Sequence, residues 1–176
     1  HGFVLGQVGN YNDIGAQGAV NIPISDTLAA RVAFYGDTRD SFYHITGPFT
    51  GDDGVRIASE RVSFLWKPSA KLTVRFKTDL NYEDLSGNPA DPVNSPNDIF
   101  HITSNARLTA LDRFLRSSLR VDYEFGNGIT LRSVTAYQDG NTGERTDLDG
   151  TSVATARFED YVPDTIRSQE FDLISP

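Results

Sequence analysis

The chain of 176 residues contains no cysteine, no methionine and one tryptophan. The lack of cysteine excludes a disulfide framework, a thiolate metal site and a cysteine nucleophile, but it does not fix a compartment. Cationic side chains are in the minority, because 16 Lys and Arg stand against 24 Asp and Glu, a formal net charge of −8. Since nucleic-acid-binding surfaces are basic, we expect no nucleic-acid partner.

Long apolar runs are absent as well. No segment approaches the roughly 18 consecutive apolar residues of a membrane helix, so any membrane span must be built from strands. The mean hydropathy of −0.37 is compatible with outer-membrane barrels, in which half of every strand faces water. The chain starts at His1 without methionine or a secretory signal, which we interpret as a mature fragment or a piece of something longer.

The chain does contain long segments of alternation. Between Leu72 and Glu83, apolar and aromatic residues occupy one parity, with Thr78 as an exception, and polar or charged residues occupy the other. Side chains alternate faces in a strand, so this segment predicts a ribbon with an apolar face and a charged face. It is longer than the roughly 5–6 residues of an ordinary strand and meets the about 9–11 of a strand that crosses a bilayer. The pattern recurs near residues 28–35, 61–67 and 115–125.

Short and long connections alternate between these segments. Residues 25–27, 68–71 and 126–128 favour tight turns. Long polar segments rich in Gly, Pro, Asp and Asn cover residues 37–55, 84–111 and 139–164. Outer-membrane barrels show this asymmetry, with the short turns facing the periplasm.

These patterns predict an all-β fold, an antiparallel up-and-down meander of about eight long strands. We expect the strands near residues 3–8, 14–24, 28–42, 56–67, 72–83, 113–125, 129–138 and 165–175.

Six segments carry a family resemblance in a fixed order, and they are Gly9–Asn12, Gly18–Ala33, Leu65–Ser69, Ser118–Tyr123, Ile129–Tyr137 and Ser168–Pro176. Together they resemble the opening barrel strands of TonB-dependent outer-membrane receptors. The resemblance implies a 22-stranded barrel that is filled by an N-terminal plug. Such a receptor takes up a scarce solute, typically a ferric siderophore, a vitamin B12-like compound or an oligosaccharide. The plug and the TonB-binding box are missing here, so residues 1–176 would be one incomplete domain, the first part of the barrel.

The resemblance further implies the outer membrane of a Gram-negative bacterium as the location. The implied partners are outer-membrane lipid, the remainder of the barrel and plug, the TonB complex through the missing N-terminal part, and a small-molecule or oligosaccharide ligand. No cofactor, metal ligand or catalytic residue is expected, so the chain would not be an enzyme. An open sheet in lipid leaves unpaired backbone groups at both edges, so further strands or partners would have to close it.

The charged side chains of the alternating strands would face a water-filled lumen. They are Arg31, Arg75, Lys77, Asp79, Arg116, Arg120, Asp122 and Glu124. Charge pairs across neighbouring strands, about 0.2–1 kcal/mol each, are a simpler role for them than substrate contact. Long-loop residues are better candidates for first contact with a ligand, although they could instead pack their own loops: Tyr43, His44, Phe49, His101 and Phe158. Aromatic rings at the strand ends would form two interfacial girdles. Trp66, Tyr123 and Phe125 lie beside the short turns, and Tyr35, Tyr82 and Tyr137 near the opposite ends.

Three alternatives remain open at this stage. One is a soluble β-rich binding or adhesion module, in which the face of Leu72, Val74 and Phe76 would be buried against a second sheet. Another is a small self-contained outer-membrane barrel with hydrolase activity, since His44 lies near Asp40 and Ser41 and the His-Ile-Thr sequence at 44–46 recurs at 101–103. The third is calcium bound at Asp52–Asp53 or Asp147–Gly150, where turn formation is the simpler interpretation.

Overall fold

The computed structural model describes residues 1–49, 54–96 and 98–176. Its ten strands are β1 (Gly2–Val8), β2 (Ile14–Pro23), β3 (Leu28–Arg39), β4 (His44–Thr46), β5 (Val55–Ser69), β6 (Leu72–Asp84), β7 (His101–Thr103), β8 (Thr109–Glu124), β9 (Thr130–Asp147) and β10 (Arg157–Ile174). Among these described residues, no helix has the length and apolarity needed to cross a membrane.

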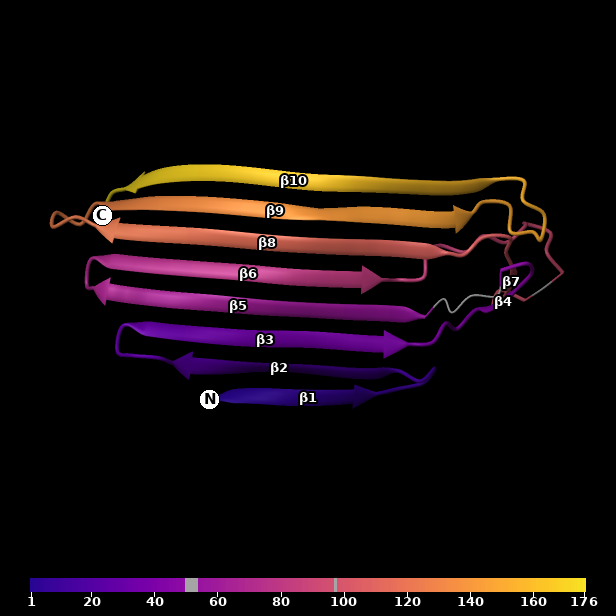
Figure 1. Cartoon of the computed structure of the whole chain (residues 1–176), viewed down its shortest axis with the longest axis horizontal. Helices are drawn as coiled ribbons and strands as arrows, with labels where there is room; N and C mark the ends of the chain where they lie inside the picture. The colour runs from indigo at the N-terminus through magenta and orange to yellow at the C-terminus, as the bar shows by residue number, and fades with distance from the viewer. Residues whose placement is uncertain (50–53, 97) are drawn as a thin grey trace.

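Eight strands form one antiparallel sheet in the order β1-β2-β3-β5-β6-β8-β9-β10, so neighbours in the sheet are successive long strands of the chain (Figure 1). This confirms the predicted all-β meander. Short connections lie at one end of the sheet, at residues 24–27, 70–71 and 125–129. The opposite end, on the right in Figure 1, holds the short connection at residues 9–13, the connection through β4, the connection through β7, and residues 148–156. We call these the turn end and the loop end.

The last hairpin is longer than the sequence suggested. The predicted long loop at residues 139–164 is wrong for most of its length, because β9 continues to Asp147 and β10 begins at Arg157. Glycine and proline in this region predict a loop, because both residues are depleted in strands. Pro163 stands opposite Asn141 in β10, an outer strand of the described sheet, and outer strands are where sheets accommodate proline. At Gly140 an added Cβ would lie 2.4 Å from the Phe114 ring, so glycine is needed for that ring to pack against β9.

The register divides the side chains into two faces. Leu80 stands opposite Glu60 and Leu115, and Phe76 opposite Phe64 and Leu119. We call the face that carries these apolar side chains the apolar face and the other the charged face. Exposed hydrophobic residues of the apolar face include Val4, Val8, Val20, Val32, Phe34, Phe64, Trp66, Leu80, Leu119, Leu131, Phe171 and Leu173.

In the part of the chain that the structure describes, no second sheet covers the apolar face. Leu119, on a central strand, keeps 39% of its surface exposed, and Phe171 keeps 69%. The few buried apolar residues are Ala19, Ala30, Ile102, Ala106 and Leu108. A soluble two-layer sandwich would bury the apolar side of each sheet against the other. The sheet instead presents that side to its surroundings.

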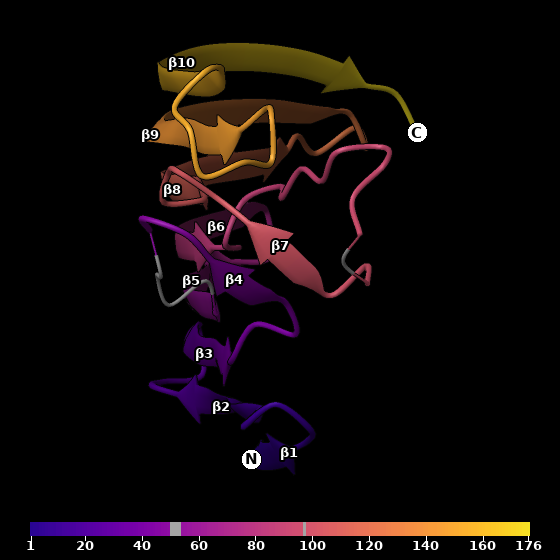
Figure 2. The same ribbon diagram turned by 90° about the vertical axis from the view of Figure 1, so that its right-hand side faces the viewer.

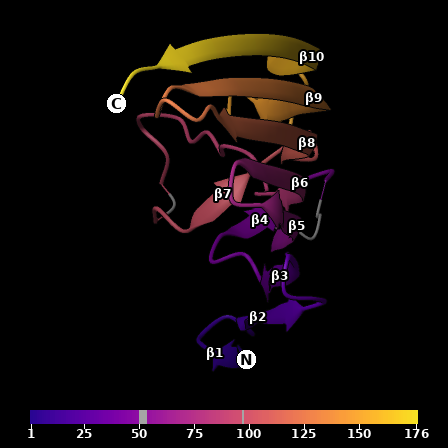
Figure 3. The same ribbon diagram turned by 90° about the vertical axis from the view of Figure 1, so that its left-hand side faces the viewer.

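The sheet is bowed, and the connection between β6 and β8 lies on its concave side (Figures 2 and 3). Asn88 in this connection donates a hydrogen bond of 2.7 Å from Nδ2 to Oε1 of Glu144. Glu144 shares its face with Gln138 and, across the ladder, with Arg116. The concave side is therefore the charged side, and the apolar face is convex.

Two short strands that the sequence analysis did not predict lie at the loop end. β4 and β7 pair in parallel, with His44 opposite His101 and Thr46 opposite Thr103. Figure 2 shows them side by side in front of the ends of the long strands. Ile102 of β7, Ser104 just after it and Asp147 at the end of β9 are buried, and the backbone N–H of Asn105 donates a hydrogen bond of 2.9 Å to the Asp147 carboxylate. We call this assembly the loop cap.

Candidate functional site

The eight residues predicted to share a face do so. Lys77 stands opposite Ser63 and Ser118, and Asp79 opposite Arg61 and Arg116. The remaining members follow from the same ladders, so the charged face carries Arg31, Arg75, Lys77, Asp79, Arg116, Arg120, Asp122 and Glu124. The pairing of these strands is regular apart from one register shift between Trp66 and Ser69 of β5, so this placement is a direct result of alternation.

Asp122 is the hub of the charged face near the turn end. Its carboxylate accepts hydrogen bonds from Arg75 Nη1 at 2.7 Å, Arg120 Nε at 2.9 Å and Arg132 Nε at 2.7 Å. The three arginines come from three adjacent strands, β6, β8 and β9, so the cluster ties the strands together. Asp122 is 14% exposed, whereas Arg75 is 48% exposed, so the carboxylate is the sheltered partner.

A second cluster lies nearer the middle of the sheet. Arg61 forms an ion pair with Asp79, and Lys77 Nζ lies 3.9 Å from the same carboxylate. Arg116 donates instead to an uncharged acceptor, Oε1 of Gln138, at 2.7 Å. The cations of this zone therefore outnumber the carboxylates that they share, and the central part of the charged face is positive.

Carboxylates gather on the same face toward the loop end. They stand at register positions beyond Asp79 and are Asp37, Glu83, Asp112, Glu144, Asp160 and Asp164. One cation accompanies them on this stretch of the face, Arg39 on β3. The charged face thus has a positive middle and an acidic border near the loops, both open to water.

The aromatic residues predicted for the interfaces are divided between the faces. Trp66 and Tyr123 lie on the apolar face at the turn end, and Phe125, in the adjoining turn, packs edge-on against Tyr123 at 5.1 Å. Tyr82 lies on the apolar face near the loop end. The other two differ from prediction. Tyr35 pairs with Ser59 on the charged face, and Tyr137 lies in the middle of the extended β9.

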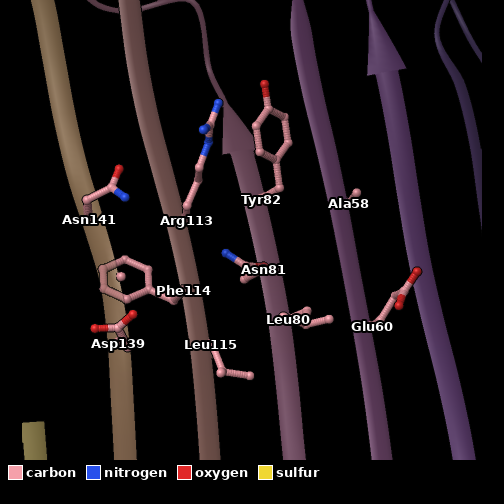
Figure 4. A pocket seen from close by; sticks show the side chains of 11 residues that line it. Ala58, Glu60, Leu80, Asn81, Tyr82, Arg113, Phe114, Leu115, Asp139 and Asn141 are labelled. Carbon is pink, nitrogen blue, oxygen red and sulfur yellow. The ribbon is translucent and has the colours of Figure 1, made fainter. Parts of the chain in front are cut away.

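A hollow of about 470 Å³ interrupts the apolar face near the loop end (Figure 4). Tyr82 and Arg113 rise side by side above it toward the loops, with the Arg113 guanidinium 5.2 Å from the Tyr82 ring centre. Glu60 and Asp139 line its lower part. The apolar surface of β5 therefore ends at Val62, earlier than that of β6. Tyr and Arg at such a border have the amphipathic character of interfacial residues.

The predicted ligand-contact residues lie at the loop end, but only some of them meet. The rings of His44 and His101 are 5.2 Å apart. The Tyr43 ring packs against the Phe42 ring, and their centres are 4.5 Å apart. Phe49 is exposed and close to residues 50–53, which lie outside the described part. Phe158 is not a loop residue, because it lies in β10 opposite Thr146.

Sequence analysis missed the centre of this aromatic cluster. The centre of the Phe42 ring lies 6.3 Å from that of Tyr11 and 6.4 Å from that of Phe100. The Arg39 guanidinium lies 5.4 Å from the same ring centre. Three loop-end connections meet at this one ring. One sequence signal could have identified these rings. Phe42 stands two residues before the first His-Ile-Thr sequence, and Phe100 stands one residue before the second.

Asp40, Ser41 and His44, the residues of the possible hydrolase site, contact other residues instead of one another. The Asp40 carboxylate accepts a hydrogen bond of 2.5 Å from Asn12 Nδ2. Ser41 Oγ accepts one of 3.0 Å from the backbone N–H of Tyr43. The His44 ring packs against His101. These contacts hold loops together.

The acidic segment after β9 is an ordered turn. Asp147 accepts hydrogen bonds from the backbone N–H groups of Asn105, Asp149 and Gly150. Asp149 accepts from Thr151 Oγ1 and from the backbone of Thr151, Thr155 and Ala156, and the Thr151 bond is the main reason that its pKa is lowered. The structure thus gives both carboxylates turn-forming roles.

Among residues 1–49, 54–96 and 98–176, no three His, Asp or Glu side chains converge on a point that could hold a metal ion. Asp52 and Asp53, the other calcium candidates, lie outside the described residues.

Comparison with protein families, curated proteins and solved structures found no match to this chain.

Proposed function

We propose that the chain forms part of the wall of a TonB-dependent receptor in the outer membrane, a plugged barrel that takes up a scarce solute. The observation that carries the proposal is the single-layer sheet, with an uncovered apolar face on the convex side and charged clusters on the concave side. Hydrocarbon would cover the first face, and an aqueous lumen would hydrate the second.

Dimensions support this proposal. On β6 the apolar positions run from Leu72 to Tyr82, which at about 3.4 Å per residue spans roughly 34 Å along the strand. A tilt of about 45° reduces this to roughly 24 Å, close to the apolar band of about 25 Å on outer-membrane barrels.

The sheet edges support a barrel with more strands. β1 and β10 are the outer strands of the described sheet, and the outer edge of each has backbone groups that need partners in lipid. Further strands on both sides, as in the 22-stranded receptors that the sequence resembles, would supply them. The remaining partners would be the plug in the lumen and, through it, the TonB complex.

The loop end would face the outside of the cell and make first contact with the solute. The aromatic cluster around Phe42 and the acidic border of the charged face lie at this end. The solute would be a ferric siderophore, a vitamin B12-like compound or an oligosaccharide.

Uptake by cells that carry the full-length receptor tests the proposal. We expect energy-dependent accumulation of a radiolabelled solute from one of these three classes, abolished by a protonophore or by loss of TonB. The matched control is the same strain without the receptor gene. Accumulation that survives both treatments, or the absence of uptake for all three classes, would contradict the proposal.

A further inference from the structure

Two of the three histidines of the chain meet at the loop cap, although 57 positions separate them. His44 on β4 and His101 on β7 are direct partners in a parallel pair, which places both side chains on the same side of the two-stranded sheet. Both imidazoles are exposed, and that of His101 is 54% exposed. The turns and the aromatic cluster described above do not explain why two imidazoles stand together here.

The spacing of the rings suits a shared metal ion. Their centres are 5.2 Å apart and their planes are inclined by 68°. Two imidazoles that bind one zinc ion tetrahedrally through bonds of about 2.0–2.1 Å have ring centres roughly 5 Å apart. A shared ion would require the exposed His44 ring to turn about its side-chain bonds toward the His101 ring, with β4 and β7 staying in place.

Asp98 adds a second, independent feature. Its Oδ2 atom lies 2.8 Å from Nδ1 of His101, and its Oδ1 atom accepts the backbone N–H groups of Phe100 and His101. A carboxylate on one imidazole nitrogen orients the ring and raises the basicity of the other nitrogen, as in the carboxylate–histidine pairs of metal sites. The hydrogen bond also lowers the pKa of Asp98. Because Asp98 bonds to Nδ1, Nε2 is the nitrogen of His101 that is left for a metal ion.

We propose that His44 and His101 form a two-histidine site for a divalent transition-metal ion on the loop cap, with Asp98 as a positioning residue. Imidazole nitrogen selects ions of the zinc, nickel and copper type over calcium and magnesium. Water would fill the other coordination positions, so the site would be open and exchangeable. The proposal does not depend on the receptor function.

Calorimetric titration of the whole chain in detergent with Zn²⁺ tests it. The background carries His1→Ala, because an N-terminal histidine with its free amine can chelate metal alone. We expect one Zn²⁺ per chain. His44→Ala and His101→Ala should each abolish saturable binding, and Asp98→Asn should weaken it by about 10–100-fold. Far-UV circular dichroism of each variant without metal verifies that the sheet is retained.

Long-range ¹H–¹⁵N spectra of the histidine rings identify the ligands directly. Zn²⁺ should shift the Nε2 resonances of His44 and His101 together, with the same midpoint as the calorimetric curve. The absence of a shift, binding that persists in His44→Ala, or zinc heat that disappears with His1→Ala would each overturn the proposal. Ca²⁺ at the same concentration serves as the negative control, and an equal calcium response would also contradict it.

Discussion

Leu119→Arg is expected to destabilise the protein folded in a bilayer by about 2–4 kcal/mol. Leu119 stands opposite Phe76, midway between Leu72 and Leu80 on the neighbouring strand. A guanidinium there would lie in the middle of the hydrocarbon band, too deep to reach either interface at low cost. Denaturant titration of the membrane-embedded protein, followed by tryptophan fluorescence of Trp66, measures the change.

The matched control is Ser168→Arg, which places the same side chain on the charged face. Ser168 stands opposite Ala136 on β9, with Glu170 two residues further along its own strand. An arginine there stays in water, so we expect a change below about 0.5 kcal/mol. Equal losses for the two variants would show that the faces do not differ in their surroundings.

Asp122→Ala should produce the largest loss among substitutions on the charged face. It removes the carboxylate that Arg75, Arg120 and Arg132 share, and it leaves three cations close together without a counter-charge. Hydrogen bonds to charged groups contribute about 1.5–3 kcal/mol, but the exposure of Arg75 and Arg120 screens part of this. We expect a net loss of about 1–2 kcal/mol, measured by the same denaturant titration.

Glu124→Ala is the control for that substitution. Glu124 lies on the same strand and the same face as Asp122. Its carboxylate forms no ion pair with any of the residues that the structure describes. Its removal should change stability by less than about 0.5 kcal/mol. A loss equal to that of Asp122→Ala would mean that overall charge, and not the three-arginine cluster, determines the effect.

Alternation was the part of the fold that could be predicted best. Period-two patterns on β6 and β8 extend over whole strands, so the shared face of Arg75, Asp79 and Arg120 followed without knowledge of the pairing. Strand ends were harder to predict. Gly140 and Pro163 have the local preferences of a loop, and only the neighbouring strands show why β9 and β10 tolerate them.

The loop cap could not be derived from local preference. His44 and His101 pair across a long sequence separation, in a parallel arrangement that no hairpin signal announces. The repeated His-Ile-Thr sequence was visible, but repetition alone does not imply contact. Likewise Tyr35 has the amphipathic character of an interfacial residue, yet its parity places it on the charged face.

Nitroxide labels placed one at a time along β6 test the central claim most directly, because the chain has no cysteine to compete with an introduced one. In the bilayer, oxygen accessibility should peak at positions 74, 76 and 80, and accessibility to a water-soluble nickel complex at 75, 77 and 79. A period of two with opposite phases is the predicted result. Nickel access at all six positions, or loss of both signals at 74 and 76 alone, would instead indicate a soluble sheet or a buried core.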